Sequence, residues 1–198
     1  MSKLVPWIAS PVKVVEEVTK LARIGPGDVV YDLGSGDGRV IVLTSKLTGA
    51  RGVGVEIDPA LIVISEEKAK EYGVQDKVKF LQKDFREVDL SEATVVYLYI
   101  YYNVIKEYLL EKLENELKPG TRVVTLEIPV PGWMPVVKRG VQDEAGVVRT
   151  LYLYIKGISE PSAWKNDEAS DEWMEEFRRR LWGNVKKPSL KVADDTSG

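Results

Sequence analysis

The chain has 198 residues, 44% of them hydrophobic, so it is long enough to bury one sizeable core. A net charge of −3 and an isoelectric point of about 5.3 argue against the broad basic surface typical of nucleic-acid binding. The absence of cysteine and histidine excludes disulfides, thiolate nucleophiles and histidine bases, and no apolar run is long enough to span a membrane. The sequence has no signal-peptide pattern, so the expected location is the cytoplasm. Charged residues make up 30% of the chain, a composition that favours a thermophilic source.

Helix and strand patterns alternate along the chain. Apolar spacing predicts helices over 12–22, 39–46, 59–72 and 103–116, and strands over 29–31, 52–58, 78–82, 94–101, 122–128, 136–141 and 147–156. Helices join the earlier strands, which should therefore be parallel with right-handed crossovers, whereas the tight connection at 143–146 makes the last pair antiparallel. The pattern predicts an α/β fold with a seven-stranded, mostly parallel sheet, helices on both faces and an antiparallel last strand.

The most informative segment is Asp32–Arg39, which reads DLGSGDGR directly after the first strand. Glycines at 34, 36 and 38 allow positive φ angles and let a ligand approach without a Cβ in the way. The helix predicted to start near Arg39 points free N–H groups at the turn. This arrangement predicts a nucleotide-type cofactor crevice at the carboxyl edge of a parallel sheet.

Acidic residues around the turn indicate which cofactor it holds. Asp32 and Asp37 flank the turn and would repel a pyrophosphate, and the spacing G-x-G-x-G departs from the dinucleotide pattern G-x-G-x-x-G. Glu56, at the end of the second strand, can accept hydrogen bonds from ribose hydroxyls. Asp84, after the third strand, suits an adenine amino group, with Phe85 available to stack. Together these features resemble the cofactor site of class I S-adenosylmethionine-dependent methyltransferases; the alternatives are NAD binding and a structural turn without a ligand.

The residues near the fourth strand restrict the methyl acceptor. Without cysteine, pyrimidine C5 methylation through a thiolate adduct is impossible, and residues 100–103 lack the Asn/Asp-Pro-Pro-aromatic motif of adenine N6 and glutamine methylation. An amine needs only to lose its proton before the attack, and desolvation lowers its pKa. An aromatic channel would suit such an acceptor, and core packing is the alternative role for the aromatic residues Tyr97, Tyr99, Tyr101, Tyr102 and Trp133.

The last forty residues differ from the rest of the chain. Residues 170–182 predict a helix with one apolar side, for which packing on the domain is favoured over a dimer contact or a substrate flap. Residues 185–198 are polar and are expected to be disordered. We therefore predict a methyltransferase domain over 1–158, including an N-terminal cap, a C-terminal extension over 159–198, and a monomer.

Several segments, in their order and spacing, carry a family resemblance. They are VPWIASP at 5–11, GDVVYDLGSGDGR at 27–39, ARGVGVEID at 50–58, SEATVVYLYIYYNV at 91–104, LKPGTRVV at 117–124 and PVPGW at 129–133. Together they resemble the small archaeal protein-lysine methyltransferases. Those proteins look like a minimal version of the non-SET, Dot-type histone-lysine methyltransferase fold and are similar to a mitochondrial lysine methyltransferase family. The resemblance covers about residues 4–157.

The resemblance implies a Rossmann-like class I fold, S-adenosylmethionine as the cofactor, no metal, and methyl transfer to lysine ε-amines of proteins. It implies that residues 5–11 cap the cofactor and that Asn103 lies at the methyl-transfer channel. From their positions after the fourth and fifth strands, we expect Tyr101 and Trp133 to line the opening of this channel. The residues expected at the cofactor are Asp32, Gly34, Ser35, Gly36, Glu56, Ile57, Asp84 and Phe85.

The chain departs from the family pattern at three places. Residues 125–128 read Thr-Leu-Glu-Ile where the family usually has Ser-His-Asp/Glu-Phe, so the histidine is lost. The channel region is rich in tyrosine, and the segment after Gly157 has no counterpart in the minimal members. We expect broad or self-directed lysine methylation with protein partners, and neither nucleic acid nor membrane as a partner. The alternatives are a small-molecule N-methyltransferase and an S-adenosylmethionine-binding module without catalysis.

Overall fold

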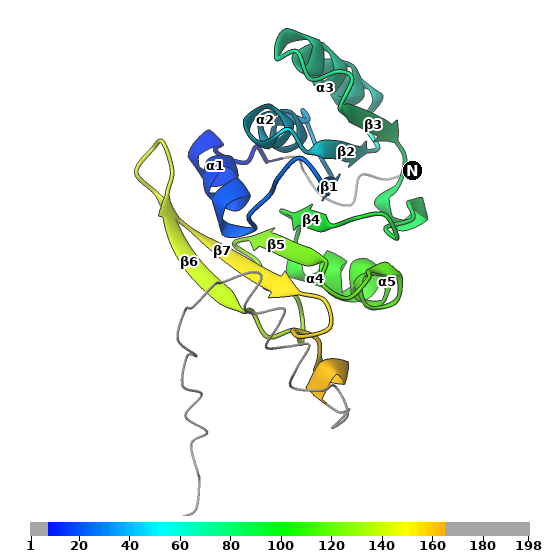
Figure 1. The fold of residues 1–198 in the computed structure, drawn as a ribbon, viewed down its shortest axis with the longest axis vertical. Helices are drawn as coiled ribbons and strands as arrows, with labels where there is room; N and C mark the ends of the chain where they lie inside the picture. The colour runs from blue at the N-terminus through cyan, green and yellow to red at the C-terminus, as the bar shows by residue number, and fades with distance from the viewer. Residues whose placement is uncertain (1–7, 165–198) are drawn as a thin grey trace, which may run out of the picture. The chain divides into compact units, whose positions relative to one another are not determined.

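The computed structural model describes residues 8–164, and a seven-stranded sheet in the order β3-β2-β1-β4-β5-β7-β6 forms its centre (Figure 1). Strands β1 to β5 are mutually parallel, and β7 runs antiparallel to both of its neighbours. This confirms the predicted fold class. The strands are β1 Val29–Leu33, β2 Arg51–Glu56, β3 Val78–Gln82, β4 Val95–Leu98, β5 Arg122–Leu126, β6 Val137–Gln142 and β7 Val148–Ile155.

Helices cover both faces of the sheet (Figure 1). On one face lie α1 Val12–Leu21, α2 Arg39–Thr48 and α3 Pro59–Glu71, with α2 in contact with both of the others. On the other face, three consecutive segments form one helical unit: α4 Tyr102–Val104, the π-helical η2 Ile105–Leu109 and α5 Leu110–Glu116. Two short 3-10 helices, η1 Phe85–Glu87 and η3 Pro161–Trp164, complete the described elements.

Strand alternation determines which face each functional side chain takes. In β1, Val29, Tyr31 and Leu33 belong to the same core cluster as Leu109 and Leu113 of the η2–α5 unit. Successive side chains of a strand point to opposite faces, so Asp32 faces the α1–α2 side. The same alternation places Gly52, Gly54 and Glu56 on that side, and a Cβ built on Gly52 would come within 2.5 Å of Ile41 in α2. Gly52 therefore lets α2 pack closely against the sheet.

Several strands are shorter than predicted, and two of them matter for the site. The fourth strand was predicted over 94–101 but ends at Leu98, and the fifth was predicted over 122–128 but ends at Leu126. The next residue, Glu127, has a φ of 64°, which is incompatible with extended strand geometry. Because β4 ends at Leu98, Tyr101 and Tyr102 lie beyond the sheet, and they are 46% and 48% exposed.

The helix ends follow the expected chemistry. The Asp58 side chain accepts a hydrogen bond from the Ala60 N–H (3.0 Å), and Pro59 occupies the first turn of α3, as predicted. Gly73, with a φ of 68°, ends the same helix.

The chain divides into two compact units, residues 1–166 and 167–198. The boundary at 158 stays a prediction, and the two residues that follow it bond back to the end of β7. Ser159 Oγ accepts a hydrogen bond from the Ile155 N–H (3.0 Å), and the Glu160 carboxylate accepts one from the Gly157 N–H (2.8 Å). The helix predicted over 170–182 and the tail over 185–198 lie outside the described residues.

Candidate active site

The glycine-rich turn joins β1 to α2 and is held against β2. The N–H groups of Gly34 and Ser35 both donate to the carbonyl oxygen of Val55, at 2.8 and 2.9 Å. Gly34, Gly36 and Gly38 all adopt positive φ, at 89°, 55° and 71°, as the motif predicted.

The space around the turn differs from one glycine to the next. A Cβ on Gly34 would meet only a side-chain carbon of Ile100, at 3.9 Å, so a ligand can approach the backbone there. A Cβ on Gly38 would come within 2.7 Å of Phe80 and Ser65, so packing requires this glycine. Ser35 is 4% exposed, and its hydroxyl has no hydrogen-bond partner among the described residues. An open backbone and an unpaired buried hydroxyl fit a polar cofactor on this turn.

Glu56 ends β2 and fixes the geometry of the turn. Its carboxylate accepts hydrogen bonds from the N–H groups of Gly36 (3.0 Å), Ile57 (2.9 Å) and Asp58 (3.0 Å). A carboxylate offers about four acceptor positions, so one position is left for a ribose hydroxyl. The side chain is 7% exposed.

Asp32 lies on the adjacent strand, and its surroundings are very different. It is 3% exposed, and the described residues provide no hydrogen-bond donor to its carboxylate. Burial, reinforced by the negative charges of Glu56 and Asp37, raises the pKa of Asp32 to about 8. A cationic group of the cofactor would remove this penalty, so the residue fits a positively charged ligand.

Asp37 does not contribute to the cofactor surface in the way the sequence suggested. Its carboxylate pairs with the Arg39 guanidinium (2.8 Å) and with Lys68 of α3. Burial alone would raise the pKa of Asp37, but the hydrogen bonds from Arg39 and Lys68 outweigh it and hold the pKa below its usual value. The charge of Asp37 is therefore already compensated, so the argument that this acid repels a pyrophosphate is wrong.

Asp84 and Phe85 follow β3, two strands away from Asp32. Asp84 is 6% exposed and accepts hydrogen bonds from the Arg86 N–H and guanidinium, both at 2.9 Å. The hydrogen bond from the Arg86 side chain holds the pKa of Asp84 below its ordinary value. Phe85 is half-buried and packs against the main core. The pair thus lies at the predicted end of the sheet, and the adenine contact stays a prediction.

The N-terminal segment reaches the same edge of the sheet through Ser10. The Ser10 hydroxyl hydrogen-bonds the Tyr97 hydroxyl (2.9 Å), and both side chains are buried. The Ser10 carbonyl oxygen accepts a hydrogen bond from Arg39 (3.4 Å). Tyr97 is the register partner of Asp32 in the sheet. The described part of the predicted cap, residues 8–11, is therefore anchored beside the glycine-rich turn, whereas residues 5–7 lie outside the described residues.

The candidates for the methyl-transfer channel lie after β4. Tyr101 precedes α4, Tyr102 begins it, and both residues, like Asn103, are exposed. The π-helical segment η2 directly follows α4, which the sequence did not predict. Single π-helical turns are frequent at functional sites. The structure brings the three residues together at the carboxyl edge, and their catalytic role stays a prediction.

Trp133 is placed differently. It is 5% exposed, belongs to the main core cluster and meets Tyr154 edge-on, with 6.1 Å between the ring centroids. Its indole N–H donates to Glu114 of α5 at 3.3 Å. These contacts favour the packing interpretation of Trp133 over stacking on a substrate cation.

Glu127 is a residue at this edge that the sequence reading did not select. It follows β5 directly, with the positive φ noted above. Its carboxylate lies 3.6 Å from the Arg149 guanidinium and accepts a hydrogen bond from the Thr150 N–H (3.3 Å). The only sequence signal was the departure of residues 125–128 from the family pattern.

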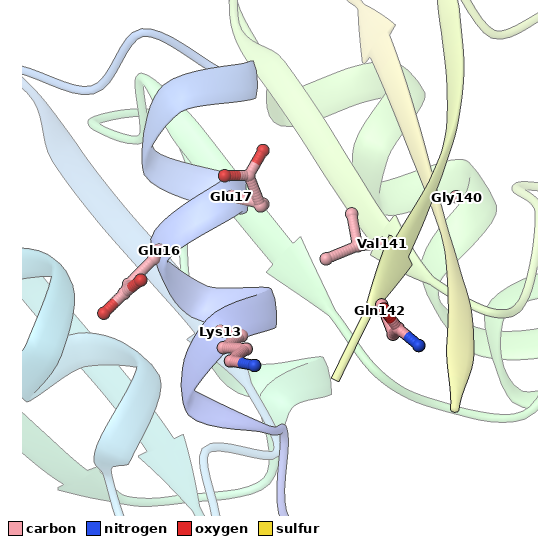
Figure 2. A pocket seen from close by; sticks show the side chains of 6 residues that line it. All are labelled: Lys13, Glu16, Glu17, Gly140, Val141 and Gln142. Atoms are coloured by element: carbon pink, nitrogen blue, oxygen red, sulfur yellow. The ribbon is translucent and has the colours of Figure 1, made fainter. Parts of the chain in front are cut away.

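A separate hollow of about 360 Å³ lies between α1 and β6, as Figure 2 shows. It is lined by Lys13, Glu16, Glu17, Gly140, Val141 and Gln142. The Val141 side chain points toward α1, and Glu17 pairs with Lys20 (2.6 Å) and Arg139 (3.7 Å). None of the predicted cofactor or channel residues lines it.

Within residues 8–164, no group of three or more acidic side chains could hold a metal ion. No helix in this part of the chain is long and apolar enough to cross a membrane.

Comparison with known proteins identifies the family. Residues 32–137 match the ANTKMT methyltransferase domain. The chain is 42% identical to a protein-lysine N-methyltransferase of Saccharolobus islandicus (strain REY15A), over 77% of this chain and 94% of the relative. It is 34% identical to the adenine nucleotide translocase lysine N-methyltransferase of Mus musculus, over 80% of this chain and 73% of the relative.

A similar solved structure contains S-adenosyl-L-homocysteine, which is consistent with S-adenosylmethionine as the cofactor. A protein described as an RNA methyltransferase from Salinibacter ruber, in complex with S-adenosyl-L-homocysteine, is 43% identical to this chain with a TM-score of 0.68, covering 75% of this chain and 93% of that one. These findings confirm the resemblance seen in the sequence. The chain belongs to the ANTKMT methyltransferase domain family and has the class I fold of methyltransferases that use S-adenosylmethionine.

Proposed function

We propose that the enzyme transfers a methyl group from S-adenosylmethionine to the ε-amine of lysine residues in proteins. The observation that carries this proposal is the 42% identity to a protein-lysine N-methyltransferase over 94% of that protein. The negative net charge of −3 favours a protein acceptor over RNA, although the Salinibacter ruber neighbour is described as an RNA methyltransferase.

The residues at the sheet edge have distinct roles in this proposal. Glu56 accepts a hydrogen bond from a ribose hydroxyl while holding the turn through the Gly36 N–H. Asp84 accepts a hydrogen bond from the adenine amino group beside Phe85, and Asp32 faces the positive charge of the cofactor. Ser35, Gly34, Gly36 and Ile57 contribute backbone or hydroxyl groups around it.

The bound cofactor supplies an electrophilic methyl group on a sulfonium. The lysine ammonium first loses its proton to solvent; its nitrogen then bonds to the methyl carbon while the carbon–sulfur bond breaks and its electron pair stays on sulfur. A lysine in water is neutral about once in 2,000 molecules at pH 7. Partial desolvation beside Tyr101 and Asn103, together with the nearby sulfonium charge, lowers the amine pKa and increases this fraction.

The proposal includes a monomeric enzyme acting in the cytoplasm. The monomer is tested by size-exclusion chromatography with light scattering, in which a molecular mass near 22 kDa is the expected result.

The acceptor is tested with labelled S-adenosylmethionine and a whole-cell extract. Label should remain in protein after nuclease treatment and appear as methylated lysine after hydrolysis. The Gly34→Val variant, whose added side chain would obstruct the turn, serves as the inactive control. Label in RNA, label only in small molecules, or no label despite cofactor binding would each contradict the proposal and favour an RNA enzyme, a small-molecule enzyme or a binding module, respectively.

A further inference from the structure

Glu127 occupies an unfavourable backbone conformation at the carboxyl edge of the sheet. Among the described residues, only Glu127 and Arg23 combine a side chain beyond glycine with a positive φ, and Arg23 lies just past the end of α1. A left-handed conformation is unfavourable for a residue that carries a Cβ. The Glu127 N–H donates to the Thr150 carbonyl oxygen (2.7 Å), and its carboxylate accepts from the Thr150 N–H. These bonds to β7 hold the residue where β5 leaves the sheet.

The charge of Glu127 is only partly compensated. Arg149 donates a 2.9 Å hydrogen bond to Asp143, which is 4% exposed, and lies 3.6 Å from Glu127. The hydrogen bond to Asp143, reinforced by the negative charge of that carboxylate, holds the pKa of Arg149 above its ordinary value. Two carboxylates thus share one guanidinium, which leaves one excess negative charge. The Glu127 side chain is 30% exposed, so it is accessible to a further cation.

The negative charge of Glu127 lies at the sheet edge where the proposed reaction takes place. Thr125, two residues before Glu127, is paired with Leu98 at the end of β4. Burial is the main reason why the pKa of Tyr97 lies above its ordinary value, and the negative charge of Glu127 adds to it. Tyr97 is in turn the register partner of Asp32. The excess charge therefore lies on the same edge as the turn that fits the cofactor, one strand beyond the tyrosines.

We infer that Glu127 is a positioning residue for the acceptor lysine: its carboxylate attracts the incoming ammonium and orients it before the proton is lost. This inference rests on the proposed function. Arg149 of β7 pairs with Glu127 and also bonds Asp143 of the β6–β7 turn, and the other titratable groups of this region are Tyr97 and Tyr99, from β4 and the residues after it. A carboxylate near an ammonium raises the pKa of the amine, so the residue favours capture of the substrate over its deprotonation.

The test is Glu127→Gln, which removes the charge but keeps an oxygen that can accept from the Thr150 N–H. With a lysine-containing peptide as substrate, we expect KM for the peptide to rise roughly fivefold at low salt, the scale of one lost solvent-accessible charge pair. The rise of kcat with pH should also move to lower pH, because the bound amine loses a neighbouring carboxylate. The melting temperature and the Kd of S-adenosylmethionine should not change.

Glu71→Gln is the matched control, because it removes the same charge from an exposed position at the end of α3. An unchanged peptide KM and pH profile in Glu127→Gln, with or without a lower melting temperature, would overturn the inference. If that variant fails to fold, Glu127→Gly suits the positive φ and removes the same charge. A wild-type enzyme that methylates no lysine would contradict the proposed function itself, which is a distinguishable result.

Discussion

At the scale of single residues, Asp32 and Glu56 lie near the carboxyl ends of neighbouring strands but in different environments. Glu56 is stabilised by three backbone N–H groups, whereas Asp32 receives no hydrogen bond from the described residues. A buried carboxylate without a donor is costly in its ionised form. The fold therefore keeps one acid charged to shape the turn and leaves the other to be stabilised by a cationic ligand.

Glu56→Gln should weaken S-adenosylmethionine binding by about 1.5–3 kcal/mol, because a charge-assisted acceptor of the ribose hydroxyls is lost. Glu56→Ala should cost at least as much, since the Gly36 N–H also loses its partner. Titration calorimetry measures the effect, with exposed Glu66→Gln as a control. An affinity equal to that of the wild type would remove Glu56 from the cofactor site.

The raised pKa of Asp32 predicts that the stability of the cofactor-free enzyme depends on pH. Its folded-state pKa of about 8 lies above the ordinary value of 3.8, so the folded protein binds this proton more tightly than the unfolded chain. The contribution of Asp32 to the free energy of unfolding should therefore fall as pH rises from about 4 to about 8 and stay constant above that range.

The measurement is the melting temperature of the wild type and of Asp32→Asn as a function of pH. Asparagine cannot titrate, so the wild type should lose stability relative to the variant between pH 5 and about 8, while other titrating groups contribute equally to both proteins. Parallel curves would show that Asp32 titrates at its ordinary pKa.

The positions of these acids could be predicted from the sequence, because strand ends are visible as boundaries of apolar runs. The basic residues that pair with the acids at this edge could not be predicted from the sequence. Lys68 reaches Asp37 from 31 residues further along the chain, and this contact depends on how α3 packs against α2. The partial compensation of Glu127 by Arg149 depends in the same way on the register between β5 and β7.

At the scale of elements, periodicity located the helices and strands to within a few residues but missed their irregularities. The helix predicted over 103–116 contains the π-helical segment η2, which no apolar spacing marks. β5 ends early because of the conformation of one residue, Glu127, whose type does not favour positive φ. Both irregularities lie at the edge where the candidate channel residues gather, as expected where function overrides local preference.

Replacing Trp133 tests whether this residue of the loop after β5 stabilises the core or contributes to the channel. Trp133→Ala should lower the free energy of unfolding by about 3–5 kcal/mol, because a core tryptophan is replaced by a cavity. The Kd of S-adenosylmethionine should stay near the wild-type value. Urea denaturation measures the change, and Met134→Ala, at a neighbouring position that is 53% exposed, is the control. Loss of methyl transfer with unchanged stability would instead support a role for Trp133 at the channel.

At the scale of the whole molecule, handedness and strand alternation explain why the fold could be predicted. Right-handed crossovers place β2 and β3 on one side of β1 and β4 and β5 on the other, so the glycine-rich turn lies where the strand order reverses. The identity of the acceptor could not be derived in this way, because it depends on exposed residues around Tyr101, Asn103 and Glu127. Proteins similar to this chain are described both as protein methyltransferases and as RNA methyltransferases.

The composition of the whole chain makes a final prediction about the reaction. For a lysine acceptor at saturating S-adenosylmethionine, kcat/KM for the acceptor should rise from about pH 7 to about 9.5, since the neutral amine increases about tenfold per pH unit below its pKa. The chain has no histidine to titrate near pH 6.5. Burial raises the pKa of Tyr97 well above its ordinary value, so this phenol stays neutral throughout. If Asp32 faces the cationic cofactor as proposed, saturating cofactor should keep it ionised and remove its titration from the profile. A sharp inflection near pH 6.5 in initial-rate measurements would therefore identify an acceptor other than an amine.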